Sequence, residues 1–121
     1  MTATKVNILG TEYSIHKKTY EEEPCLKENH WTGFCNGLTK EIVLLDLNKT
    51  DNWKKEDQNT RDICVKESLR HEIIHAFLNE SGLQDNAGQP SGAWSKNEEM
   101  VDWFAIQSPK IFKVFSELGI L

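Results

Sequence analysis

The residues with the clearest chemical potential form the segment His71-Glu72-Ile73-Ile74-His75. Two histidines four positions apart on a helix lie one turn apart on the same face, so both imidazoles can bind one zinc ion at about 2.0–2.1 Å. Glu72 is the candidate general base. It would take a proton from a zinc-bound water whose pKa the metal lowers toward neutrality. The pattern predicts a catalytic zinc site with His71 and His75 as metal ligands.

The residues around this segment are mostly apolar, so this turn of the helix is expected to be buried on most sides. Buried imidazole and carboxyl groups need polar partners. A metal ion with a bound water would satisfy all three groups. The alternative is a pair of core histidines hydrogen-bonded to carbonyls, with Glu72 in an internal ion pair. The apolar residues are Leu69, Ile73, Ile74, Ala76, Phe77 and Leu78.

A catalytic zinc ion usually has three protein ligands and one open position, so a third ligand is expected outside the motif. The segment Asn97–Asp102 lies on the next predicted helix and reads Asn-Glu-Glu-Met-Val-Asp. HExxH followed by N-E-x-x-x-D resembles the gluzincins, zinc peptidases of thermolysin type. The resemblance implies that Glu98 is the third metal ligand. It also implies that Asp102 accepts a hydrogen bond from the second ring nitrogen of His71.

Glu98 and Asp102 are four residues apart and share a helix face, in agreement with this assignment. A carboxylate behind His71 would fix its tautomer and raise its basicity. Three alternatives remain open. Ser95-x-x-Glu98 also fits a capping box, in which Glu98 turns back to the backbone. Glu99 could be the ligand instead, and Asp102 could be an ordinary solvated helix residue.

The run Trp103-Phe104-Ala105 extends the resemblance to the ImmA/IrrE-like metallopeptidases, and most closely to short HExxH proteins of bacterial prophages and mobile elements. The resemblance covers about residues 69–107 and implies a Zn²⁺ cofactor and a protein or peptide substrate. For the N-terminal half, only the order of strands before helix fits the minimal zincin plan.

Strands are expected to precede this helix. Alternating apolar residues predict a β-hairpin over 4–17, and a second strand pair at 31–35 and 41–47 with Asn36-Gly37 in the turn. Ile42-Val-Leu-Leu is typical of a central strand. The acidic segment 18–29 is predicted to be an exposed excursion, and the polar segment 48–60 a surface loop.

Helices are expected to fill the second half. A helix is predicted from about Arg61 to Ser81, with Gly82 as its C-terminal cap. Ser95 is predicted to cap a helix to about Gln107, and Ser108-Pro109 to start a last helix. The expected fold class is α+β: an N-terminal antiparallel β-sheet, the HExxH helix, a second ligand-bearing helix and a C-terminal helix, a minimal zincin-like arrangement. Residues 1–121 are expected to form one domain.

The composition limits the function classes. Of 121 residues, 14 are basic and 19 acidic, a net charge of −5 that argues against a nucleic-acid partner. No apolar stretch approaches the roughly 18–20 residues of a membrane span. The N-terminus lacks the apolar core of a secretory signal, so a cytoplasmic location is expected. Three cysteines without a close pair favour reduced thiols, and Cys25, Cys35 and Cys64 are expected to be structural or incidental.

The sequence thus predicts a zinc-dependent hydrolase, a metallopeptidase of gluzincin type that cleaves a peptide bond with a water activated by Glu72. A strand at the sheet edge near the site is expected to pair with an extended substrate. Trp94 and Trp103 could line a substrate groove, although core packing is favoured. The alternative function is a non-catalytic prophage interaction module with a structural zinc site. Oxyanion stabilisation needs a donor, for which the sequence offers Tyr13, His16, Tyr20, His30 and Arg70 without selecting among them.

Overall fold

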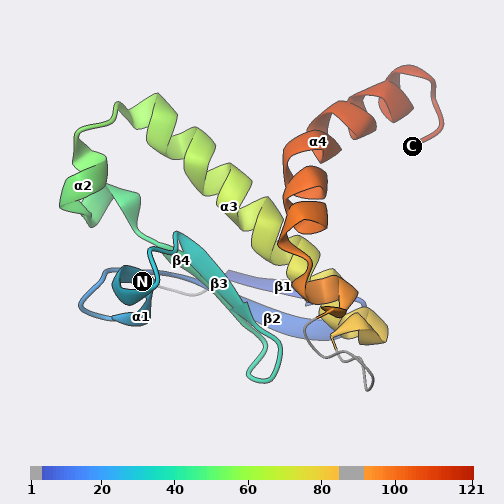
Figure 1. Cartoon of the computed structure of the whole chain (residues 1–121). Coiled ribbons are helices and arrows are strands. Elements are labelled where there is room, and N and C mark those ends of the chain that lie inside the picture. Colours follow the sequence, from blue (N-terminus) through green and yellow to red (C-terminus); the bar gives the residue numbers. More distant parts are fainter. Residues whose placement is uncertain (1–3, 85–91) are drawn as a thin grey trace.

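A computed structural model describes residues 4–84 and 92–121 and shows an α+β fold, with a mixed sheet followed by helices (Figure 1). Within the described residues the sheet has four strands in the order β1-β2-β4-β3. The strands are β1 (Thr4–Ile8), β2 (Thr11–Lys18), β3 (Gly33–Asn36) and β4 (Glu41–Leu45). Both predicted strand pairs are confirmed as antiparallel: β1 with β2, and β3 with β4.

The prediction of a wholly antiparallel sheet is wrong, because β2 and β4 pair in parallel, with Ile15 opposite Ile42. After β2 the chain passes through α1 (Cys25–Glu28) and β3 before it returns as β4 beside β2, in the direction of β2. A parallel pair requires such a long connection, whereas a tight turn can join only antiparallel strands.

Strand β4 is buried on both faces, as predicted for a central strand, and its side chains alternate between two cores. Ile42 and Leu44 pack with Ala76 of α3 (Gln58–Leu78). Val43 and Leu45 pack on the other face with Leu26 of α1. Leu26 is fully buried, so the prediction that 18–29 is an exposed excursion is wrong for this residue, whereas Lys27 and Glu28 of the same helix are exposed.

The predicted surface loop over 48–60 is mostly helical. It contains part of η1 (Leu47–Lys49), all of α2 (Asp51–Lys54) and the first turn of α3, which starts at Gln58 rather than near Arg61. The Asp57 side chain caps α3 by accepting a hydrogen bond from the Thr60 amide at 2.7 Å. Arg61 Nη1 donates to the carbonyl of Glu56 at 2.7 Å, and this bond fixes the turn before α3. Short polar helices of this kind carry no apolar periodicity that sequence inspection could detect.

The HExxH helix is confirmed. Helix α3 ends at Leu78 and continues as a π-helical turn, η2 (Asn79–Leu83), in which Gly82 has a φ of 82°. That positive φ at the end of the helix agrees with the predicted role of Gly82 as a cap.

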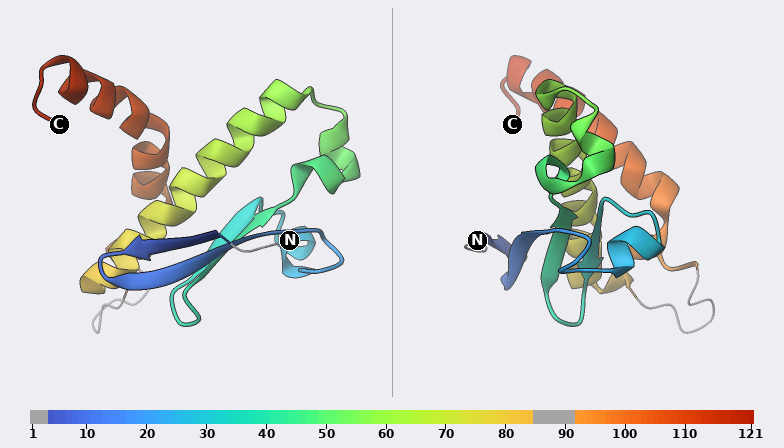
Figure 2. Two further views of the ribbon diagram at one scale, coloured as in Figure 1. Left: turned by 180° about the vertical axis from the view of Figure 1, so that it is seen from behind. Right: turned by 90° about the vertical axis from the view of Figure 1, so that its left-hand side faces the viewer.

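A single helix, α4 (Glu98–Glu117), replaces the two helices predicted over 95–107 and after Ser108. Asn97 rather than Ser95 caps it, by accepting a hydrogen bond from the Met100 amide at 3.0 Å. Pro109 lies inside α4, which changes direction in its middle part (Figure 1). In both views of Figure 2 the C-terminal part of α4 extends away from the sheet. The side chains of this part are largely exposed, Phe112, Val114, Phe115 and Leu118 among them.

Among the described residues, no helix has both the length and the apolar composition that a membrane span requires.

Candidate metal centre

The two histidines of the motif lie one turn apart on α3 and point to the same place. Their Nε2 atoms are 3.1 Å apart, and their ring centroids are 4.8 Å apart. Both side chains are largely buried, with 16% of His71 and 13% of His75 exposed. The two rings converge because residues four apart lie on the same face of a helix, as the sequence predicted.

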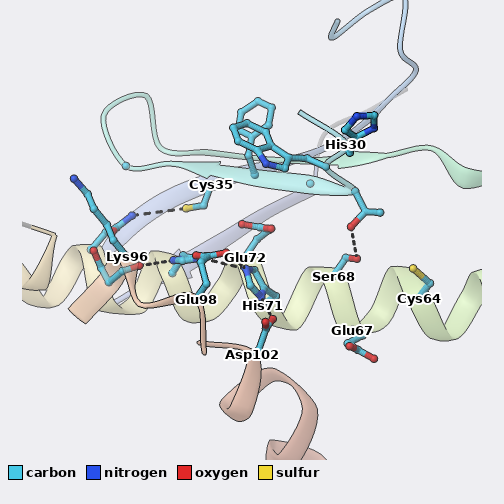
Figure 3. A pocket seen from close by; sticks show the side chains of 18 of the residues that line it. His30, Cys35, Cys64, Glu67, Ser68, His71, Glu72, Lys96, Glu98 and Asp102 are labelled. Carbon is cyan, nitrogen blue, oxygen red and sulfur yellow. Dashed lines mark hydrogen bonds and ion pairs between the residues drawn. The ribbon is translucent and has the colours of Figure 1, made fainter. Parts of the chain in front are cut away.

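Glu98, the first residue of α4, brings its carboxylate to both imidazoles (Figure 3). Its Oε1 lies 2.7 Å from Nε2 of His75, and its Oε2 lies 3.3 Å from Nε2 of His71. The capping-box alternative for Glu98 is wrong, because Asn97 caps α4 and Ser95 precedes it in a 3-10 turn, η4 (Trp94–Lys96). Glu99 does not line this site and borders a separate shallow groove on α4.

The other ring nitrogen of each histidine has its own partner. Nδ1 of His71 lies 2.7 Å from Oδ1 of Asp102, the pair that the sequence predicted. Nδ1 of His75 lies 2.5 Å from the backbone carbonyl oxygen of Ser95. A carbonyl oxygen can only accept, so Nδ1 of His75 carries the proton, and the Asp102 carboxylate favours the same tautomer in His71.

With both ring protons on Nδ1, the two Nε2 lone pairs and the Glu98 carboxylate face one another. Three such acceptors require a positive charge among them, from protons or from a metal ion. Ligands about 2.0–2.1 Å from a tetrahedral zinc ion lie about 3.3 Å apart. The separations of 3.1 Å between the two Nε2 atoms and 3.3 Å between His71 and Glu98 are close to that spacing. Glu98 Oε1 lies at hydrogen-bond distance, 2.7 Å, from Nε2 of His75, so a small shift of the Glu98 side chain would let His71, His75 and Glu98 hold a zinc ion.

Glu72 points from the same turn of α3 toward the sheet and is 6% exposed. Burial raises the pKa of its carboxyl to about 7; His71 opposes this rise, and the Glu98 and Asp102 carboxylates add to it. The ligating atoms of His71, Glu72 and His75 all lie within 4.8 Å of one another. A carboxylate of this kind can both accept and release a proton near neutral pH.

Gly33 of β3 lies directly opposite Glu72. A Cβ atom at this position would be 3.5 Å from Oε2 of Glu72 and only 2.9 Å from the carbonyl oxygen of Val43. Glycine therefore lets the strand lie close to the carboxylate. The sequence analysis missed this role, because a glycine that begins a strand gives no local signal of what faces it across a groove.

The centre lies in a groove of about 970 Å³ between α3 and β3 (Figure 3). Its walls include Gly33 and Cys35 from the strand, Glu72 and Asn79 from α3 and η2, and Lys96 from η4. The candidate ligands therefore face an open groove.

Most of the residues considered as oxyanion donors lie elsewhere. Tyr13 is buried and donates to Oε2 of Glu80 at 2.6 Å, and Arg70 Nε donates to the carbonyl of Ala105 at 2.6 Å. Nε2 of His16 lies 3.0 Å from Oγ of Ser14, and Tyr20 is partly buried against the core cluster of Leu26. Of these residues His30 alone lines the groove, at the end remote from His71 (Figure 3).

The remaining aromatic and thiol residues are outside the ligand set. Trp94 and Trp103 are not among the residues that line the groove, and the core packing favoured for them is wrong, since they are 62% and 53% exposed. The three cysteines are free thiols. Cys35 and Cys64 line the groove, but burial raises the pKa of the Cys35 thiol to about 12, which keeps it protonated and a poor metal ligand.

No family model matches this sequence, and comparison with curated proteins and with solved structures finds no match.

Proposed function

We propose that the protein is a zinc-dependent peptidase of the gluzincin type, with a minimal zincin-like fold. The observation that supports this most is the convergence of His71 Nε2, His75 Nε2 and the Glu98 carboxylate, with both Nδ1 atoms held by other partners. The resemblance of HExxH and N-E-x-x-x-D to the zinc peptidases of thermolysin type supports the same assignment. Zn²⁺ is the implied cofactor.

His71, His75 and Glu98 would hold the ion, and Asp102 and the Ser95 carbonyl orient the two imidazoles. When bound, zinc would lower the pKa of a water molecule toward neutrality and polarise the substrate carbonyl.

Glu72 is the proposed general base. Its carboxylate takes a proton from the water as the oxygen of that water attacks the carbonyl carbon of the peptide bond. The same carboxyl then gives the proton to the amine nitrogen as the carbon–nitrogen bond breaks. Its buried position, within 4.8 Å of the ligating atoms of both histidines, supports this role.

Strand β3 supports the assignment of a peptide substrate. Among the described strands it pairs with β4 alone and forms one edge of the sheet. The carbonyl of Thr32 accepts from Leu45 and that of Asn36 accepts from Lys40, both at 2.9 Å, so these carbonyls point toward β4. Along a strand, the backbone N–H and C=O groups of successive residues point alternately toward and away from the neighbouring strand. The backbone groups of Gly33 and Cys35 therefore point outward, away from β4. An extended peptide can pair with them beside Glu72.

The substitution Glu72→Gln tests this proposal. It keeps the size of the side chain and removes its capacity to accept a proton. We expect the variant to bind zinc as the wild type does and to lose at least about 100-fold in peptide hydrolysis, since a general base contributes roughly 10²–10⁴-fold. Unchanged hydrolysis by the zinc-loaded variant would contradict the proposed role of Glu72. Zinc binding with no hydrolysis by the wild type would instead favour the non-catalytic interaction module.

A further inference from the structure

Lys96 of η4 lies beside the metal centre but is not one of its candidate ligands. The residue before it, Ser95, places its carbonyl oxygen 2.5 Å from Nδ1 of His75. Two residues after it, Glu98 turns both carboxylate oxygens toward the histidines. These contacts on either side hold the backbone of Lys96 at the His75 end of the centre.

The ammonium group of Lys96 has a distinct place in the charge of the groove. Lys96 is the only lysine or arginine among the described residues that line the groove, and it is exposed. The lysines that form ion pairs within the described residues are others. The remaining charged residues of the walls are carboxylates: Glu67, Glu72, Glu98 and Asp102.

The lysine marks the end of the groove toward which β3 runs. Figure 3 shows Lys96 and Cys35 on one side of Glu72, and Ser68 on the other. Strand β3 begins at Gly33, where a Cβ atom would be 3.5 Å from Oε2 of Glu72. It reaches Cys35 two residues later, about 7 Å along the strand.

The direction of β3 decides which part of a bound peptide passes Lys96. A peptide that pairs with the outer edge of β3 in the commoner antiparallel orientation runs against the strand. Its N-terminal part then lies toward Cys35 and Lys96, and its C-terminal part toward Ser68. Because an extended peptide advances about 3.3 Å per residue, the residue beside Lys96 is the second or third before the cleaved bond.

We propose that Lys96 is a specificity residue that binds an acidic side chain of the peptide substrate, at the second or third position before the cleaved bond. This inference rests on the proposed peptidase function of the metal centre. A substrate carboxylate would pair with the ammonium group at this position, and the carboxylates along the rest of the groove would repel it elsewhere. A basic side chain beside Lys96 would meet a like charge.

A glutamate scan tests this assignment. The probes are nonapeptides with blocked termini, Ser at each end and Ala between, with one Glu, Gln or Lys placed at each inner position in turn. Zinc-loaded wild type should cleave at the second or third bond after the Glu. Its kcat/KM should be about two- to fivefold above that for the matching Gln peptide, the range for an exposed ion pair. The matching Lys peptide should be the poorest of the three, and added salt should reduce the differences.

Charge reversal gives the sharpest readout. Lys96→Glu should reverse the order, so that the Lys peptide is cleaved faster than the Glu peptide. Lys96→Gln should bring the Glu and Gln peptides to equal rates. Lys110→Glu is the matched control, because Lys110 is exposed on α4 and does not line the groove. It changes the net charge equally and should keep the wild-type order.

Circular dichroism and zinc analysis verify the fold and the metal content of each variant. Equal wild-type rates for the Glu and Gln peptides would overturn the role of Lys96 and leave the peptidase assignment standing. A preference for Glu after the cleaved bond, or the same reversal in Lys110→Glu, would have the same meaning.

Binding separates the two proposals. Calorimetry with zinc-loaded Glu72→Gln should give a Kd for the best Glu peptide about two- to fivefold below that for the matching Gln peptide. The added substitution Lys96→Gln should remove this difference. Such binding without hydrolysis by the wild type would support the role of Lys96 and contradict the peptidase. Equal Kd values for the two peptides would overturn the role of Lys96.

Discussion

The Arg70 side chain of α3 donates a hydrogen bond from Nε to the backbone carbonyl of Ala105 in α4, at 2.6 Å. Ala105 lies four residues before Pro109, which has no N–H to donate to that carbonyl. Arg70 thus satisfies the acceptor that the proline leaves free. It also joins α4 to α3 next to His71, whose ring is bound to Asp102. Both helices that carry the candidate ligands are held together at this point.

Replacing Arg70 should therefore weaken metal binding. Arg70→Ala leaves the Ala105 carbonyl without its charged donor, a loss of about 1.5–3 kcal/mol in the free energy of unfolding. Freer movement of α4 should raise the Kd for zinc several-fold. Urea unfolding and competition with a zinc chelator measure the two effects.

Arg61→Ala is the matched control for this prediction. Arg61 also donates to a backbone carbonyl, that of Glu56, but at the opposite end of α3. It should lower the stability of the protein and leave the zinc Kd unchanged. Equal zinc affinities of the Arg70 variant and the wild type would rule out the proposed link between α4 and the centre.

Asp102 and Glu99 make a second matched pair. Asp102→Ala removes the carboxylate that orients His71 and should weaken zinc binding about 10–100-fold. Glu99→Ala removes an equal charge from the same turn of α4, but Glu99 borders the other groove and should leave zinc affinity nearly unchanged. If the two variants lost affinity equally, net charge rather than the His71 contact would explain the effect.

Gly33→Ala should reduce hydrolysis and preserve zinc content. The new Cβ would lie 2.9 Å from the Val43 carbonyl oxygen and 3.0 Å from Leu44 Cδ2, so β3 would have to shift relative to Glu72. A displacement of this kind can cost up to about 100-fold in rate. Leu38→Ala, in the exposed turn after β3, is the control and should retain full activity. Wild-type rates in the Gly33 variant would contradict the close approach of the strand.

Glu80 should make stability depend on acid pH. Hydrogen bonds from Lys40 at 2.7 Å and Tyr13 at 2.6 Å lower the pKa of its carboxyl to about 2, below the value of about 4.3 for an unfolded chain. The stabilisation is complete above the unfolded pKa and is lost as the pH falls through the folded pKa, because the unfolded state then binds the proton more readily.

Urea unfolding from pH 7 to pH 2 measures this effect in the wild type and in Glu80→Gln. The variant should be less stable at pH 7, and the difference should shrink between about pH 4.5 and pH 2. Glu117→Gln, an exposed substitution at the end of α4, should show no such convergence. A stability difference that is independent of pH would disprove the contribution of the ionised Glu80.

The local parts of this structure could be predicted from the sequence, and the non-local parts could not. The HExxH spacing predicted the convergence of His71 and His75, and the motif resemblance predicted the pairing of His71 with Asp102. The parallel pairing of β2 with β4 joins segments that are far apart in the chain, and no turn signal specifies it.

Two further differences arise from tertiary contacts. Pro109 predicted a helix boundary, but α4 continues through it because Arg70, from another helix, satisfies the Ala105 carbonyl. The partner of His75 is a backbone carbonyl, that of Ser95. Every residue has such a group, so its role could not be recognised from residue type.

Zinc content is the most direct test of the central claim, that His71, His75 and Glu98 hold a metal ion. Elemental analysis of protein purified without chelator should give one zinc ion per chain for the wild type and for Glu72→Gln. His71→Ala, His75→Ala and Glu98→Ala should each lose most of it, with their folds verified by circular dichroism. Wild-type protein without tightly bound metal, or full zinc content in the folded histidine variants, would contradict the claim.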